Sequence, residues 1–161
     1  MTQTVQLPNV CEFVSRHLVD VFDTMLAMKA GLVPNAPPPH FTERVTGSVG
    51  FAGETVTGAV YLHLPAPLAT HITAAMLGLP SEETPGDSDV NDVVGEVTNM
   101  LAGGLKSWLC DAGAVCALTT PAIIRGRSFH ILAGEGVSRI KFAFESGPHQ
   151  VVLEAHIKFT N

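Results

Sequence analysis

The sequence predicts an α+β fold of two layers, with three helices packed on a mostly antiparallel sheet of about six strands. Apolar residues recur at helical spacing in three segments, at about residues 9–31, 66–78 and 88–112. The segments between and after them alternate and are rich in Val, Thr and Gly, as several of the predicted strands require. The 161 residues are therefore expected to form one domain, spanning 1–161, with a substantial core.

The first helix is expected to begin after Pro8, where Asn9 can cap it and Glu12 occupies the third helical position of a capping box. Its apolar residues recur up to Gly31, which is expected to end it, and its apolar face is expected to pack on the central helix. Residues 34–39, PNAPPP, cannot continue a helix. They are predicted to be an extended connector, with a PxxP ligand motif as the alternative.

A β-hairpin is predicted after this connector, from residues 44–51 and 55–64 around the turn at Gly53 and Glu54. The prolines that follow permit a second, shorter helix, which closes at Gly78.

An acidic, turn-rich loop then leads to the central helix, for which Asp87 to Asp89 offer an N-cap. Strands are expected again after Gly113, the last two of them joined by the turn sequence SGPH. Their predicted ranges are residues 116–125, 128–132, 137–145 and 150–159.

The chain also shows a weak internal repeat. A shift of 75 positions places residues 20–27, DVFDTMLA, over residues 95–102, GEVTNMLA, and each copy is a helix followed by a hairpin. The two halves are therefore predicted to be diverged copies, although shared helical periodicity alone produces part of this match. In this register Val21 and Thr24 replace the Glu and Asn of the second copy, so the first copy lacks its polar pair.

The central helix is amphipathic. Its apolar side carries Val90, Val93, Val94, Val97, Met100, Leu101, Leu105 and Trp108. Its opposite side, the outer face, carries Asp92, Glu96, Asn99, Gly103 and Lys106. Glycine inside a helix costs about 1 kcal/mol relative to alanine, and both Gly103 and Gly104 lie there. A missing side chain at Gly103 permits close approach by another surface; the alternative is a helix back that only faces water.

Glu96 and Asn99 can do little chemistry unaided. The Asn amide offers a donor and an acceptor, which suit it to hold a water in one orientation, but it is neither a nucleophile nor a strong base. The charge of a glutamate on an exposed helix is largely screened by water and salt. The pair therefore needs a partner that supplies a metal, an electrophile and desolvation.

Asp92, Glu96, Asn99 and Pro121 resemble a family signature: an acidic or Ser residue, Glu four positions later, Asn three after that, and Pro about twenty residues downstream. The string GEVTNMLAGGLKS also resembles the surrounding E-L-x-N-M-x-x-G-x-x-x-S pattern. The family is that of the bacterial chemotaxis phosphatases CheX and CheC, with the flagellar relatives FliY and FliM. One copy of the motif resembles CheX more than CheC, whose chains usually carry two. Gly104 departs from the pattern, since many relatives carry Asn there.

The resemblance implies a phosphatase that acts on the phospho-aspartate of a CheY-like response regulator. Asn99 would orient the attacking water, Glu96 would dock the regulator's active-site lysine, and Asp92, Gly103 and Lys106 would contact the partner. It implies no metal or cofactor on this chain, because the regulator would supply the Mg²⁺. Together with the apolar share of 46%, it also implies a homodimer formed by sheet pairing.

Two other interpretations remain open. A noncatalytic adaptor could bind a response regulator or another signalling protein through the same outer face. A small-ligand sensor could use the apolar content to line a pocket, but it has no sequence feature of its own.

Composition argues against further classes. The net charge of −6, with scattered basic residues, is unlike that of a nucleic-acid binder. No leader is recognised and no segment approaches the roughly 18 apolar residues of a membrane span, so the protein is expected in the cytosol, away from membranes. The three cysteines, Cys11, Cys110 and Cys116, are expected to be buried thiols. The seven histidines show no metal-ligand spacing.

Overall fold

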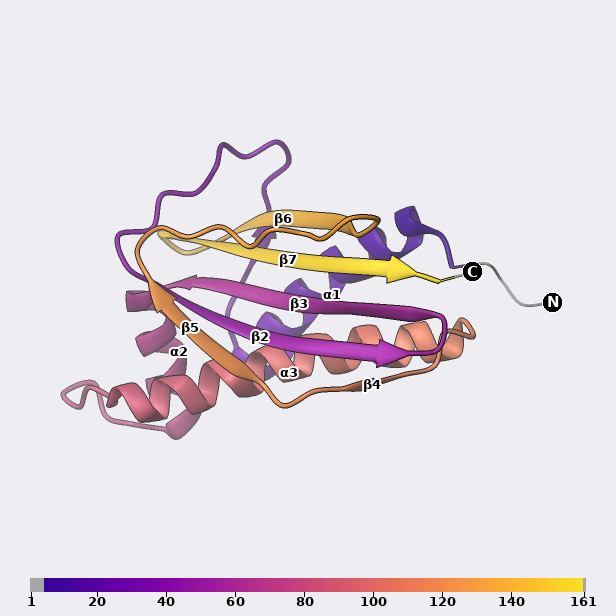
Figure 1. Cartoon of the computed structure of the whole chain (residues 1–161). Helices are drawn as coiled ribbons and strands as arrows, with labels where there is room; N and C mark the ends of the chain where they lie inside the picture. The colour runs from indigo at the N-terminus through magenta and orange to yellow at the C-terminus, as the bar shows by residue number, and fades with distance from the viewer. Residues whose placement is uncertain (1–4, 161) are drawn as a thin grey trace.

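The computed structural model describes residues 5–160 and places three helices against one face of an open antiparallel sheet (Figure 1). The predicted α+β fold is confirmed, with seven strands rather than about six. In chain order the elements are α1 (Leu7–Leu26), β1 (Gly31–Leu32), β2 (Arg44–Gly53), β3 (Val56–Pro65), α2 (Ala66–Leu77), α3 (Asp87–Asp111), β4 (Cys116–Leu118), β5 (Ala122–Gly126), β6 (Ser138–Ser146) and β7 (His149–Phe159).

Helix α1 is shifted toward the N-terminus relative to its prediction, and the capping box at Asn9 is wrong. The N-cap is Gln6, which makes no side-chain cap bond, and Pro8 lies in the first turn, where its missing N–H is not needed. The helix ends at Leu26 rather than Gly31, because Ala27 adopts a left-handed conformation with φ of 50°.

Helix α3 likewise differs from its prediction at its first residues. Its N-cap is Gly86 and makes no side-chain cap bond, so the predicted cap at residues 87–89 is wrong. Asp87 and Asp89 lie instead in the first turn, where negative charge is favoured by the helix dipole. Helix α2 ends as predicted, with Gly78 as a left-handed C-cap.

Both predicted hairpins are confirmed, but the strands between α3 and β6 differ from their prediction. The segment 116–125 is divided into β4 and β5 at Pro121, which cannot donate a ladder hydrogen bond. The predicted strand at residues 128–132 is wrong, since this segment is irregular. Strand β1, only two residues long, was not predicted.

The internal repeat is visible in the sheet order, β1-β6-β7-β3-β2-β4, with β5 also paired to β2. The short strand of the first half, β1, pairs with β6 of the second hairpin, and β4 and β5 of the second half pair with β2 of the first. The two hairpins meet in the middle through β3 and β7. Each half therefore completes the edge of the other.

Helix α3 lies directly on the sheet and is packed beside α1 and α2. The contact with β2 is close because Gly47 has no side chain: a Cβ there would overlap the Thr98 side chain, whose hydroxyl donates to the Val94 carbonyl at 2.7 Å. The contact with α1 depends on Gly104, since a Cβ there would overlap the imidazole of His17. The predicted pairing of the first and central helices is confirmed.

The opposite face of the sheet carries no helix (Figure 1). On this outer face of the sheet, which is distinct from the outer face of α3, strands β2, β3 and β7 carry a buried polar group. Its members are Arg44, Thr46, His63, Glu154 and His156. The connector between β1 and β2 and the segment after β5 line a cavity with Arg44, His63 and Glu154 of this group. Within residues 5–160, no helix is long and apolar enough to cross a membrane.

Candidate functional site

The outer face of α3 is formed as the sequence predicts. Asp92 and Glu96 are exposed, while Asn99, Gly103 and Lys106 are partly exposed, all on the side of the helix away from the sheet. The predicted apolar side is buried or packed against the core, with Met100 and Trp108 as its partly covered members. The structure therefore brings together all five residues of the predicted site.

Glu96 and Asn99, one helical turn apart, are both unengaged. Within residues 5–160, neither side chain makes a hydrogen bond or an ion pair with another residue. Asn91, on the same helix, differs: its amide oxygen accepts from Arg125 Nε at 2.9 Å and from a terminal nitrogen of Arg125 at 2.8 Å. The carboxylate and the amide of the candidate pair are thus available to a partner molecule.

One flank of the outer face is formed by β5 and the residues before it. Pro121 lies beside Gly95, where a Cβ would meet the proline Cβ at 3.4 Å. Arg125 binds Asn91 and lies 3.9 Å from the Asp87 carboxylate, which ties β5 to the first turns of α3. The signature proline is therefore positioned next to the helix turn that carries Glu96.

The other flank comes from α1. His17 lies against Gly104, and its Nε2 is 3.3 Å from the Met100 carbonyl oxygen. The ring of Phe13 stacks with both His17 and Trp108, at centroid distances of 5.1 and 5.8 Å. Because Gly104 has no side chain, the imidazole of His17 from the neighbouring helix occupies the space beside it.

Because Gly103 has no side chain, the outer face of α3 has a shallow gap near its middle. A Cβ built there would have no other atom within 4 Å, so the glycine is not required by packing inside the described chain. An approaching loop could instead use this space. No group of three or more metal-ligating side chains occurs within residues 5–160, and the three cysteines are free thiols.

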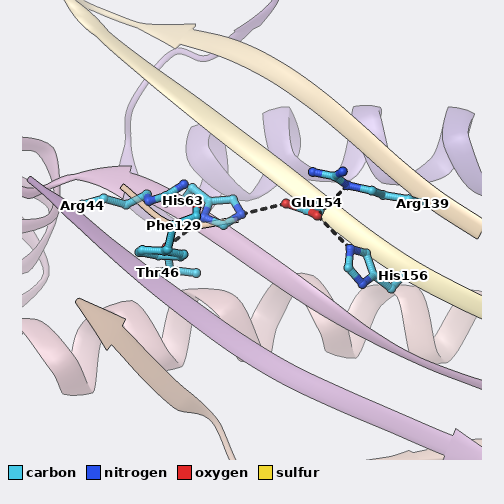
Figure 2. A network of polar contacts seen from close by, with 7 residues as sticks. All are labelled: Arg44, Thr46, His63, Phe129, Arg139, Glu154 and His156. Carbon is cyan, nitrogen blue, oxygen red and sulfur yellow. Dashed lines mark hydrogen bonds and ion pairs between the residues drawn. The ribbon is translucent and has the colours of Figure 1, made fainter. Parts of the chain in front are cut away.

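A second polar cluster, not predicted from the sequence, lies on the outer face of the sheet. Figure 2 shows Glu154 at its centre, accepting from His63 Nε2 at 3.1 Å, His156 Nε2 at 2.7 Å and Arg139 Nε at 2.9 Å. The Thr46 hydroxyl bonds His63 Nδ1 at 2.8 Å. The spacing E-A-H at residues 154–156 was the available signal, since alternate strand residues share a face.

The charges of this cluster follow from burial and partners. Desolvation raises the pKa of Glu154, but the bonds from His63 and His156 and the charge of Arg139 outweigh it and hold the pKa at about 2. Burial lowers the pKa of His63 despite its bond to Glu154. Glu154 is thus an ionised carboxylate, only 2% exposed, that accepts hydrogen bonds from three donors.

Sequence comparison identifies the family. The family model described as chemotaxis phosphatase CheX matches residues 45–145, which include the Glu96 and Asn99 pair and Pro121. The chain belongs to the CheX family. The resemblance drawn from the motif is thereby confirmed, whereas a comparison with curated proteins gave no match.

Solved structures agree with this assignment. The chemotaxis protein CheX from Vibrio vulnificus is 26% identical, with a TM-score of 0.79 over 96% of this chain and 100% of that one. A CheC-like superfamily protein from Shewanella sp. PV-4 is also 26% identical, with a TM-score of 0.78 over 96% and 99%. The Borrelia burgdorferi CheX–CheY–BeF3–Mg²⁺ complex shares the fold at 18% identity, with a TM-score of 0.67 over 98% and 100%.

Proposed function

We propose that this CheX-family protein hydrolyses the phospho-aspartate of a CheY-like response regulator. Asn99 orients the attacking water, and Glu96 docks the regulator's active-site lysine. The observation that carries the proposal is the unengaged Glu96 and Asn99 pair on the outer face of α3, beside an open Gly103. Such a pair lacks the means to act alone but can complete another protein's site.

The chemistry divides between the two proteins. Water attacks phosphorus opposite the aspartyl oxygen, the bond between phosphorus and that oxygen breaks, and the products are free phosphate and the aspartate carboxylate. The regulator supplies the acyl phosphate and Mg²⁺. Asn99 contributes by holding the water in line, and such positioning can account for several kcal/mol of the barrier.

The partner class is supported by the Borrelia burgdorferi relative, whose structure is a complex with CheY, BeF3 and Mg²⁺. Asp92 and Lys106, on either side of the pair along α3, are proposed to contact the regulator, and Gly103 to admit one of its loops. The flanks at Pro121 and His17 would then border the docked partner on both sides of the helix.

The decisive assay follows the decay of a phosphorylated regulator, with and without this protein, under matched Mg²⁺. Faster release of phosphate is expected, in proportion to the protein added. Unchanged decay with every cognate regulator tested would overturn the enzyme proposal. If the protein bound the BeF3-treated regulator without speeding decay, the noncatalytic adaptor would be supported instead.

We also propose a homodimer formed through the edge of β6. Strand β1 covers only the Phe144 and Glu145 end of β6, with Val33 donating to the Ala143 carbonyl, so the rest of this edge has no strand partner within residues 5–160. Light scattering on the purified protein should give twice the chain mass of 17.0 kDa. A mass of one chain at micromolar concentration would contradict it.

A further inference from the structure

A cavity of about 340 Å³ lies on the outer face of the sheet, which α3 does not occupy. Its floor is formed by strand residues that include Arg44, His63 and Glu154, and its walls are the connector at residues 38–42 and the irregular segment at residues 127–131. Cavities of this size accommodate small organic ligands. The segment at residues 128–132, which was wrongly predicted to be a strand, thus forms part of a cavity wall.

The charge of the cavity is opposite to that of the protein. Four of the nine Lys and Arg residues line it, in a chain whose net charge is −6. They are Arg44, Arg127, Arg139 and Lys141. The one carboxylate in the lining, Glu154, is already bound by three donors. Four positive charges against one negative charge leave an excess of three, which concentrates positive potential in the cavity.

One of the four positive charges, that of Arg44, is buried. Its guanidinium carbon lies 3.5 Å from the ring centroid of Phe129 and 5.2 Å from that of Phe41, and the residue is 8% exposed. One terminal nitrogen donates to the Phe129 carbonyl, but Nε is buried without a hydrogen-bond partner within residues 5–160. Burying an incompletely paired cation is costly, so an acceptor at this position would stabilise it.

Figure 2 shows Arg44 and Arg139 on opposite sides of the His63 and Glu154 pair, from different strands. Arg139 uses only Nε to bind Glu154, and its side chain remains 39% exposed. Arg127 and Lys141 are exposed at the cavity wall. The cations therefore surround the cavity from several segments rather than forming a row on one element.

We propose that this cavity binds a small, multiply charged anion that carries phosphate or several carboxylates. Guanidinium groups suit both acceptors because they donate two parallel hydrogen bonds. The excess of three positive charges favours a polyanion over a single carboxylate. The apolar walls at Pro38, Pro39 and Ile131 leave room for an organic portion. This site is separated from the outer face of α3 by the sheet, and it does not depend on the proposed phosphatase function.

Calorimetric titration of the full chain with pyrophosphate, adenosine monophosphate and citrate tests the proposal and separates its ligand classes. Binding of at least one anion is expected with a dissociation constant below 1 mM, an affinity of about 4 kcal/mol or more. Preference for pyrophosphate or adenosine monophosphate assigns phosphate, and preference for citrate assigns carboxylates. Absence of binding by all three would overturn the proposal.

Two double variants localise the binding. Arg127→Gln with Lys141→Gln removes two exposed cavity cations and is expected to weaken binding at least tenfold. Arg16→Gln with Lys29→Gln changes the net charge equally on exposed residues outside the cavity lining and should change the affinity less than twofold. Equal weakening in both would indicate nonspecific attraction and contradict the site.

The Nε–H resonance of Arg44 should also shift on saturation, and a static resonance in the presence of binding would contradict its role.

Discussion

Glu96 and Glu154 receive opposite treatment in the same chain. Glu96 is exposed on α3 and has no polar partner within residues 5–160, whereas Glu154 is 2% exposed and accepts from three side chains. A carboxylate whose bonds are all made inside the fold contributes to stability and has little left to offer a partner. One that makes none contributes little to the fold and remains available. The proposed function therefore belongs to the carboxylate that makes no polar contact within the described part of the chain.

The largest stability effect is expected at the buried glutamate. Glu154→Gln removes the charge that His63, His156 and Arg139 converge on, leaving a buried set of donors without its anion. Because the side chain of Arg139, the permanent cation of the set, is 39% exposed, the main loss is that of a buried acceptor, which costs roughly 1–3 kcal/mol. Urea unfolding should show this loss, while Glu96→Gln should leave the midpoint unchanged. Equal stability of the two variants would remove the contrast.

The pH dependence of stability should reflect the same cluster. The folded pKa values of His63 and Glu154 lie below their ordinary values of 6.5 and 4.5, so both groups contribute stability above those values. Protonation of the unfolded chain then weakens the fold as pH falls below 6.5 through His63, and again as pH falls from 4.5 toward 2 through Glu154. Unfolding free energies measured at several pH values should decrease in these windows, and Glu154→Gln should flatten the acidic one.

Two adjacent glycines provide a smaller comparison within α3. Gly103→Ala meets open space and should stabilise the helix by about 0.5–1 kcal/mol, because alanine is the better helix former. Gly104→Ala must displace His17 from the Met100 carbonyl and from its stack with Phe13, which offsets that gain. Thermal unfolding should therefore rank Gly103→Ala above the parent and above Gly104→Ala. The reverse order would show that Gly103 is held by packing.

The smallest effect is expected from the exposed charge in the proposed docking role. Glu96→Gln keeps the shape of the side chain but removes its attraction for a lysine. Exposed ion pairs contribute about 0.2–1 kcal/mol, so the regulator concentration for half-maximal activity should rise up to about fivefold. High salt should reduce the difference between the variant and the parent. A loss of the maximal rate alone would contradict the docking role.

Much of the candidate site could be predicted from the sequence because its information is local. Helical periodicity alone places Asp92, Glu96 and Asn99 on one face, and Gly103 on the same face borders open space. The helix and hairpin segments were also recognisable. The flank at His17 was not, because it depends on how two helices, far apart in sequence, meet at Gly104.

The wrong predictions about the fold also have physical causes, because they depend on contacts that local sequence does not show. No residue preference marks Ala27 as the left-handed residue that ends α1. The segment at residues 128–132 has strand-like composition, but it lines the cavity on the outer face of the sheet and pairs with no strand. The Glu154 cluster joins residues 91 positions apart, and a charged residue in a strand is ordinarily read as facing water.

The central claim is tested most directly by comparing two asparagines of α3. Asn99→Ala removes an unengaged amide, and Asn91→Ala removes one that Arg125 already binds. Phospho-regulator decay should slow by about 10²- to 10³-fold with Asn99→Ala, by analogy with the loss of one positioned donor, while its unfolding free energy does not decrease. Asn91→Ala should retain nearly full activity. Full activity of Asn99→Ala, or an equal loss in both variants, would contradict the account.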